Sequence, residues 1–281
     1  MKKLWLLSFL FAAVALTAAA QSADYGLWTG AEVDWKLSKR VTLNSAVESR
    51  LEQKLKKDTR WSFSVGADWK IVPKFLKAGI GLMYINSYNP QEVKVNYNNS
   101  GVMKGYNIDE GFNRDRFRAY TDLTAKYGVG RFTFSLRERY QYTHNFATST
   151  TRHRYRNVVS DPDNYTPAPG ELPPYFDGTT YYAHSGDATN DKEHGNKHCL
   201  RQRFAVSYNI KGVPLEPSVS FEITHNLSKA FSIEKRRWRI GTDYDIDKQN
   251  SLTFGYVYNN SSDDDEVGDL HALEVGYTFK F

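Results

Sequence analysis

The chain has 281 residues with a formal net charge of +5, and aromatic residues make up 15% of it. Acidic and basic residues are interspersed throughout, so the charge excludes a basic nucleic-acid-binding protein. A mean hydropathy of −0.61 excludes a bundle of membrane helices, and the single cysteine, Cys199, excludes an intramolecular disulfide.

Residues 1–20 have the composition of a secretory signal peptide. Lys2 and Lys3 precede an apolar stretch, and small residues at 18–20 form a cleavage site. A membrane-anchoring helix is the alternative, but the apolar stretch is short and the small residues follow it at once. We therefore expect an exported protein whose mature chain, residues 21–281, forms one barrel domain.

Period-two alternation begins directly after this segment. Apolar side chains recur at every second position in four segments, at 25–37, 41–52, 60–71 and 76–84. These segments run about ten residues or more, enough for a tilted strand to cross a bilayer, whereas strands of soluble sandwiches usually have about five or six residues. The length favours a transmembrane barrel with one apolar face and one polar face on each strand.

Two polar segments, at about 86–111 and 145–198, interrupt the alternation, and we expect both to be long extracellular loops. Further strands are predicted at 114–125, 131–139, 200–208, 219–224, 237–246 and 252–258. The connections SKR, VPK, YGVG, KGVP and DKQ are short, and they alternate with longer polar ones. Short periplasmic turns and longer outer loops are typical of outer-membrane barrels.

The last strand, Leu270 to Phe281, has an apolar face that ends on an aromatic carboxyl terminus. Tyr277, Phe279 and Phe281 have the pattern by which the barrel-assembly machinery recognises its substrates. The count of strands is eleven, but bacterial barrels are even-numbered, so we expect ten to twelve strands and favour twelve. The prediction is a monomeric, antiparallel, up-and-down β-barrel in the outer membrane of a Gram-negative bacterium, in contact with outer-membrane lipid.

The mature chain resembles a family of predicted outer-membrane barrels known as domain of unknown function 2490. The stretches that carry the resemblance are Glu216 to Glu222, Arg236 to Tyr258, the region around Trp28, and Glu48-Ser49-Arg50. The resemblance implies the barrel and its location. It implies no activity, cofactor or catalytic residue.

Charged residues on the polar faces of the strands are expected to meet across a narrow lumen. These residues are Glu48, Arg50, Glu52, Arg114, Arg116, Arg118, Arg137, Arg139, Arg201, Arg203, Glu222, Arg237, Arg239, Asp243 and Asp245. Acids among the arginines favour a lumen plugged by ion pairs, because small barrels are usually filled by side chains. The alternative is a porin-like channel for a small anionic solute, since rings of arginine select anions.

Three other candidate sites are weaker. His194 and His198 have the spacing of two metal ligands on a helix, within a segment that also holds His144, His153 and His184. The cluster Asp263–Glu266 could hold calcium, but it lacks EF-hand spacing.

His225 and Ser228 are the residues that an outer-membrane lipid hydrolase could use. On a regular strand, however, residues three apart point to opposite faces, and no third member of a triad is evident. We expect that the protein is not an enzyme and that it binds no metal or cofactor. The leading hypothesis is a barrel whose outer loops recognise an extracellular ligand.

Overall fold

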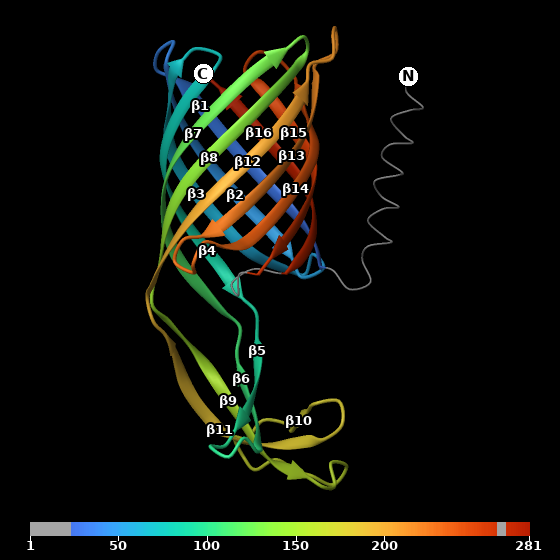
Figure 1. The fold of residues 1–281 in the computed structure, drawn as a ribbon. Helices are drawn as coiled ribbons and strands as arrows, with labels where there is room; N and C mark the ends of the chain where they lie inside the picture. Colours follow the sequence, from blue (N-terminus) through green and yellow to red (C-terminus); the bar gives the residue numbers. More distant parts are fainter. Residues whose placement is uncertain (1–23, 263–267) are drawn as a thin grey trace, which may run out of the picture. The chain divides into compact units, whose positions relative to one another are not determined.

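The computed structural model describes residues 24–262 and 268–281, and the predicted signal peptide and the Asp263–Glu266 cluster lie outside them. The described residues form strands and no helices, and they divide into two compact units. One unit is a closed barrel and the other is a five-stranded sheet built from two inserted segments (Figure 1). No helix in the described ranges is long and apolar enough to cross a membrane.

The barrel confirms the predicted fold class, an up-and-down barrel in which sequential strands are mostly antiparallel. Its strands have 12 to 18 residues, as their alternating sequences predict. They are β1 (Asp24–Lys36), β2 (Val41–Glu52), β3 (Lys57–Val72), β4 (Leu76–Asn89), β7 (Phe112–Val129), β8 (Phe132–Asn145), β12 (Gly195–Tyr208), β13 (Leu215–Asn226), β14 (Ser232–Asp245), β15 (Asn250–Ser261) and β16 (Asp269–Lys280).

The barrel has eleven strands, not the twelve that the even-number rule favoured. An odd count is possible because the first and last strands pair in parallel, from Asp24 opposite Leu270 to Asp34 opposite Lys280. The other edge of β1 pairs with β2 in the usual antiparallel manner. Parallel pairing satisfies the backbone groups of both strands, so no edge strand is left and no twelfth strand is needed.

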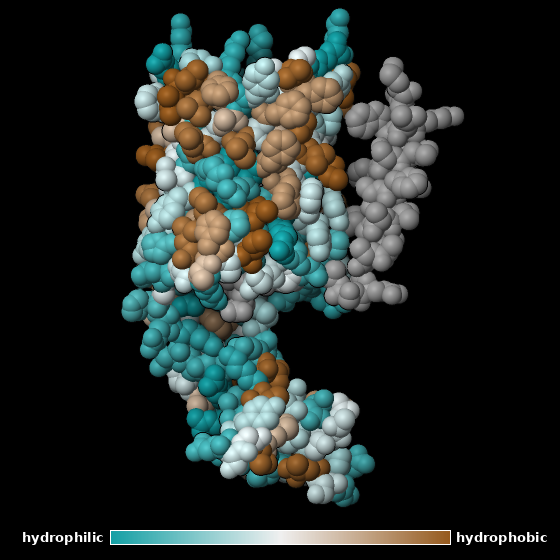
Figure 2. Space-filling view, in the orientation of Figure 1, coloured by the Kyte–Doolittle hydropathy of each residue, from teal (hydrophilic) through white to brown (hydrophobic). Residues whose placement is uncertain are grey.

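The outward face of the barrel is apolar and exposed, and Ile80 and Trp35 are 63% and 57% exposed. Figure 2 shows apolar residues gathered over the barrel wall. Soluble monomers rarely expose large contiguous apolar surfaces, so this wall is compatible with a barrel of the outer membrane. The exposed apolar residues of the wall include Val33, Val47, Phe63, Val65, Trp69, Leu82, Leu123, Leu136, Phe204, Val219, Trp238, Ile240, Phe254, Leu273 and Val275.

The two segments predicted as long loops form strands instead. Residues 88–114 and 146–195 make up the second unit, whose strands lie in the order β10-β11-β9-β6-β5. The polar alternation of these segments concealed the strands, because a small exposed sheet needs little apolar surface. The strands are β5 (Glu92–Tyr97), β6 (Met103–Asp109), β9 (Thr148–Val159), β10 (Tyr175–Phe176) and β11 (Tyr181–Lys192).

Two connections expected to be long are also tight turns, at 53–56 and 227–231. In the first, Gln53, Lys54 and Leu55 all have left-handed backbone conformations with φ between 51° and 64°. The backbone N–H groups of Gln53 and Lys54 donate hydrogen bonds to the carboxylate of Asp24, at 2.7 and 2.8 Å. These bonds offset part of the cost of the left-handed conformations and hold β1 to this turn.

Candidate functional site: the charged barrel lumen

The alternation of the strands turns their charged faces into the barrel, where they surround a cavity of about 220 Å³. Ten arginines and two lysines line it, against three acids among the described residues. The lining is therefore strongly cationic. The charged residues are Arg50, Arg60, Arg116, Arg118, Arg137, Arg139, Lys197, Arg201, Arg203, Lys235, Arg237 and Arg239, with Glu48, Glu222 and Glu234.

Eleven of the fifteen residues predicted for the lumen line this cavity. The prediction omitted Arg60, although that residue lies on the inward side of its strand. It also omitted Lys197, Glu234 and Lys235, which precede the points at which strands were expected to begin. Glu234 and Lys235 are neighbours that both line the cavity, because β14 has an irregular register with β13 at this point.

Glu222 is the acid around which the cavity is organised. It is 4% exposed, and its carboxylate lies 2.6 Å from Arg201 Nη2, 3.1 Å from Arg137 Nη2 and 3.6 Å from Arg237 Nη1. The three arginines come from β12, β8 and β14, while Glu222 belongs to β13. One carboxylate therefore faces three guanidinium groups, and it offsets only part of their charge.

Other ion pairs bind single arginines to the wall. Arg50 Nε lies 2.7 Å from Glu48, and the Arg50 guanidinium lies over the Trp28 ring at 3.9 Å. On β8, Arg139 pairs with Asp122 of β7 at 2.5 Å. These contacts fix the directions of the arginines, so the cationic lining is ordered in advance of any bound anion.

Four residues predicted for the lumen do not line this cavity, although one of them, Asp243, lines a second cavity of the lumen described below. Glu52 accepts hydrogen bonds from Trp28 Nε1 and the Thr59 hydroxyl, at 3.0 and 2.8 Å. Arg114 belongs to the inserted unit, where it donates to the carbonyl oxygens of Phe146 and Glu193. The remaining two, Asp243 and Asp245, are exposed toward the end of β14. The strands that hold these four residues were predicted correctly, but those strands extend beyond the cationic cavity.

A second cavity, of about 410 Å³, shares Glu48, Arg203, Ser220 and Arg239 with the first. Its charged lining also includes Glu32, Asp243 and Glu274, and Arg239 Nε pairs with Glu274 at 2.9 Å. Acids thus outnumber cations here. The lumen changes from a cationic to an acidic lining along the barrel.

The structure does not support the helical metal pair that the spacing of His194 and His198 suggested. No helix forms there: His194 precedes β12, which begins at Gly195, and His198 lies on that strand, so the two histidines do not share a helical face. The His198 ring instead lies 2.7 Å from the Tyr140 hydroxyl, and His144 lies 2.7 Å from Asn196.

The candidate hydrolase residues are not arranged as a nucleophile and base. The Ser228 hydroxyl accepts a hydrogen bond from the backbone N–H of His198 at 3.2 Å. The His225 ring stacks on Phe231 with ring centroids 4.3 Å apart. No contact described in this part of the barrel joins Ser228 to the His225 ring.

The comparison with known protein families agrees with the family resemblance seen in the sequence. No curated protein matches the sequence. Residues 25–268 match a family described as protein of unknown function (DUF2490), and this match covers the barrel strands through β15 and ends just before β16. The chain therefore belongs to the DUF2490 family.

Proposed function

We propose that the protein is a bacterial outer-membrane β-barrel whose narrow lumen selects small anions and lets them pass. The exposed apolar wall and strands of 12 residues or more support the membrane location, because a tilted strand crosses the hydrocarbon layer in about 9–11 residues. Aromatic residues at the strand ends, among them Trp35, Trp69, Tyr127 and Tyr277, are exposed as interfacial girdles require.

The observation that carries the anion preference is the excess of cations around the 220 Å³ cavity. Like charges in a confined space repel one another, and a mobile anion relieves that repulsion. Arginine suits this role because its planar donors match the oxygens of carboxylates and phosphates. Rings of arginine bias pores toward anions in the same way.

This excess also distinguishes the proposal from a balanced plug of ion pairs. In a balanced plug, acids and cations would surround the cavity in similar numbers, because an excess of buried charge of one sign is costly. Here three acids line the cavity with twelve cations, and two further acids, Asp122 and Glu274, pair with lining arginines from outside it. The ion pairs order the wall, and the remaining positive charge attracts the solute.

The test is single-channel conductance of the refolded protein in a planar bilayer, with the reversal potential measured in a salt gradient. We expect anion-selective conductance. Replacing Arg116, Arg118, Arg137 and Arg139 by glutamine should lower the anion-to-cation permeability ratio several-fold, because each removes a lining charge. A matched control replaces four exposed turn residues of the same charge, Lys39, Arg131, Lys211 and Lys248, by glutamine, and the ratio should stay close to the original.

A correctly folded barrel that conducts no ions would contradict the proposal and favour a plugged lumen. Function would then be sought on the inserted sheet, as the hypothesis of ligand-binding outer segments requires. Equal effects of the lumen and turn substitutions on selectivity would also contradict it, since the lumen would then not be the selecting site.

A further inference from the structure

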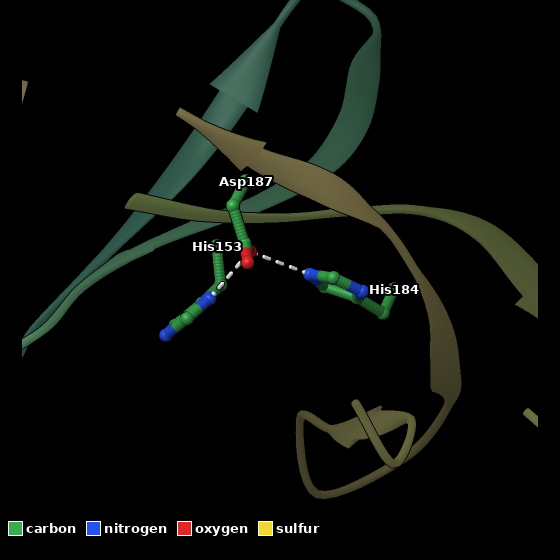
Figure 3. A group of neighbouring side chains, drawn as sticks. All are labelled: His153, His184 and Asp187. Atoms are coloured by element: carbon green, nitrogen blue, oxygen red, sulfur yellow. Dashed lines mark hydrogen bonds and ion pairs between the residues drawn. The ribbon is translucent and has the colours of Figure 1, made fainter. Parts of the chain in front are cut away.

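Two histidines and an aspartate come together within the inserted sheet, and none of them lines the cationic cavity (Figure 3). Asp187 Oδ1 lies 2.6 Å from Nδ1 of His153 and 2.8 Å from Nε2 of His184. His153 belongs to β9, and the other two residues belong to β11. One carboxylate oxygen therefore joins two imidazole rings across two adjacent strands.

An irregularity in β11 creates this arrangement. His184 and Asp187 are three residues apart, and on a regular strand they would point to opposite faces. The pairing of β11 with β9 shifts register between these two residues, and Gly186 has a φ of +99° at the shift. Only glycine adopts this conformation readily, and the resulting bulge turns both side chains to one face. Such bulges are enriched beside functional sites.

We propose that His153, His184 and Asp187 bind a divalent transition metal of the zinc type, with His153 Nδ1, His184 Nε2 and Asp187 Oδ1 as ligands. These three atoms all lie within 4.8 Å of one another. Two imidazoles and one carboxylate form a set that suits Zn²⁺, whereas Mg²⁺ and Ca²⁺ prefer oxygen ligands alone. The proposal is independent of the anion-selective lumen.

The surroundings of His153 fit a metal ligand. Its second ring nitrogen, Nε2, lies 3.0 Å from the carboxylate of Glu110. A carboxylate on the far nitrogen of a ligating histidine fixes the ring and raises its basicity, as in many zinc sites. Partial burial lowers the pKa of His153, but the hydrogen bonds to Asp187 and Glu110 outweigh it and raise the pKa overall.

The surroundings of His184 and Asp187 leave one side of the site open. His184 is 5% exposed and lies against the Tyr155 ring, with ring centroids 5.5 Å apart. Asp187, in contrast, is exposed at the surface of the sheet. A metal held by three protein ligands at an accessible position retains room for a fourth ligand, such as water.

Metal binding has identifiable consequences for the protons. The metal displaces the proton that His153 Nδ1 donates to Asp187, and this proton goes to solvent. At His184, the metal takes the lone pair of Nε2, so the ring proton moves to Nδ1. There the long hydrogen bond from the Leu172 backbone N–H, at 3.3 Å, must open. It is the one described contact of these rings that opposes binding.

The test is zinc binding to the full-length protein, refolded in detergent and stripped of metal by a chelator, with dialysis followed by metal quantification. We expect the original chain to bind zinc saturably. The double variant His153→Gln/His184→Gln should bind one zinc ion fewer per chain. Glu110→Gln should keep the site but weaken it about 10–100-fold, as loss of a carboxylate behind a ligating histidine does. His271→Ala, on barrel strand β16, is the matched control and should bind as the unmodified chain does.

Unchanged stoichiometry and affinity in the double variant would overturn the proposal, as would the absence of saturable zinc binding to the folded original chain. Cobalt binding to the original chain gives a second readout that does not depend on variants folding. We expect the intense visible absorption of four-coordinate cobalt with nitrogen and oxygen ligands. A spectrum of solvated, six-coordinate cobalt would count against the site.

Discussion

Replacing Glu222 by glutamine is expected to destabilise the barrel by about 3–5 kcal/mol, because the substitution leaves buried positive charge without its counter-charge. The carboxylate of Glu222 contacts Arg137, Arg201 and Arg237 and is 4% exposed. Glutamine has the same shape but cannot neutralise these groups. The measurement is reversible urea unfolding of the barrel refolded into lipid vesicles.

The same variant should strengthen the proposed anion preference of the lumen, since three guanidinium groups lose the acid that faces them. Loss of stability together with increased anion selectivity is specific to the proposed arrangement. Glu216→Gln is the matched control, because Glu216 lies on the same face of β13 and its carboxylate accepts a hydrogen bond from Ser207. If the two variants lost equal stability, Glu222 would not be the centre of the charge network.

Replacing Asp109 by asparagine is expected to destabilise the inserted sheet by about 3–5 kcal/mol. Asp109, in β6, is 2% exposed, and its carboxylate oxygens lie 2.6 and 2.9 Å from Nε and Nη2 of Arg152 in β9. Asn190 and Lys192 of β11 donate to it at 2.6 and 3.2 Å. This single side chain joins three strands, so hydrogen exchange should accelerate across all three while barrel amides remain protected.

The contribution of Asp109 should depend on pH in a defined direction. The hydrogen bond from Arg152, aided by Lys192, lowers the pKa of Asp109 to about 2, whereas its ordinary value is 3.8. A lowered folded-state pKa gives stability that is present above the unfolded value and is lost as the pH falls from 3.8 through about 2. The difference between the variant and the original protein should therefore shrink in that window.

Asp191→Asn is the control for this prediction, because Asp191 is an exposed carboxylate on β11. It should leave hydrogen exchange of the sheet nearly unchanged. Equal protection in the Asp109 and Asp191 variants at neutral pH would show that Asp109 does not hold the strands together.

The alternation of apolar and polar residues accounted for most of the barrel prediction. In a strand, the period of two fixes which side chains face outward, so Trp35 and Ile80 could be placed on the wall from the sequence alone. The raw count of eleven strands was correct, and the general rule for bacterial barrels led away from it. The parallel closure follows from that count, because in an up-and-down sheet of eleven strands the first and the last run in the same direction.

The inserted sheet was not predictable in the same way. Its strands are short or polar, and residues such as Asp109 and Arg152, 43 positions apart, contribute through a pair whose spacing carries no local pattern. The His153–Asp187 cluster depends on a bulge at Gly186, whereas sequence reasoning assumed helical spacing and favoured His194 and His198. Sequence patterns report local periodicity, and these sites arise where periodicity breaks or distant strands pair.

The parallel closure of the barrel places the start of β1 and the end of β16 at opposite rims of the barrel. β1 starts at the rim from which β4 and β8 lead into the inserted unit, and β16 ends beside the short turns, where the Phe281 N–H bonds to the Asp34 carbonyl at 2.8 Å. If the barrel lies in the outer membrane as proposed, with its short turns toward the periplasm, an epitope inserted directly before Asp24 would be accessible on intact cells, while one after Phe281 would be accessible only from the periplasm. Under the same proposal, the start of β1 would have to reach the cell surface before β1 could pair with β16 along the parallel seam.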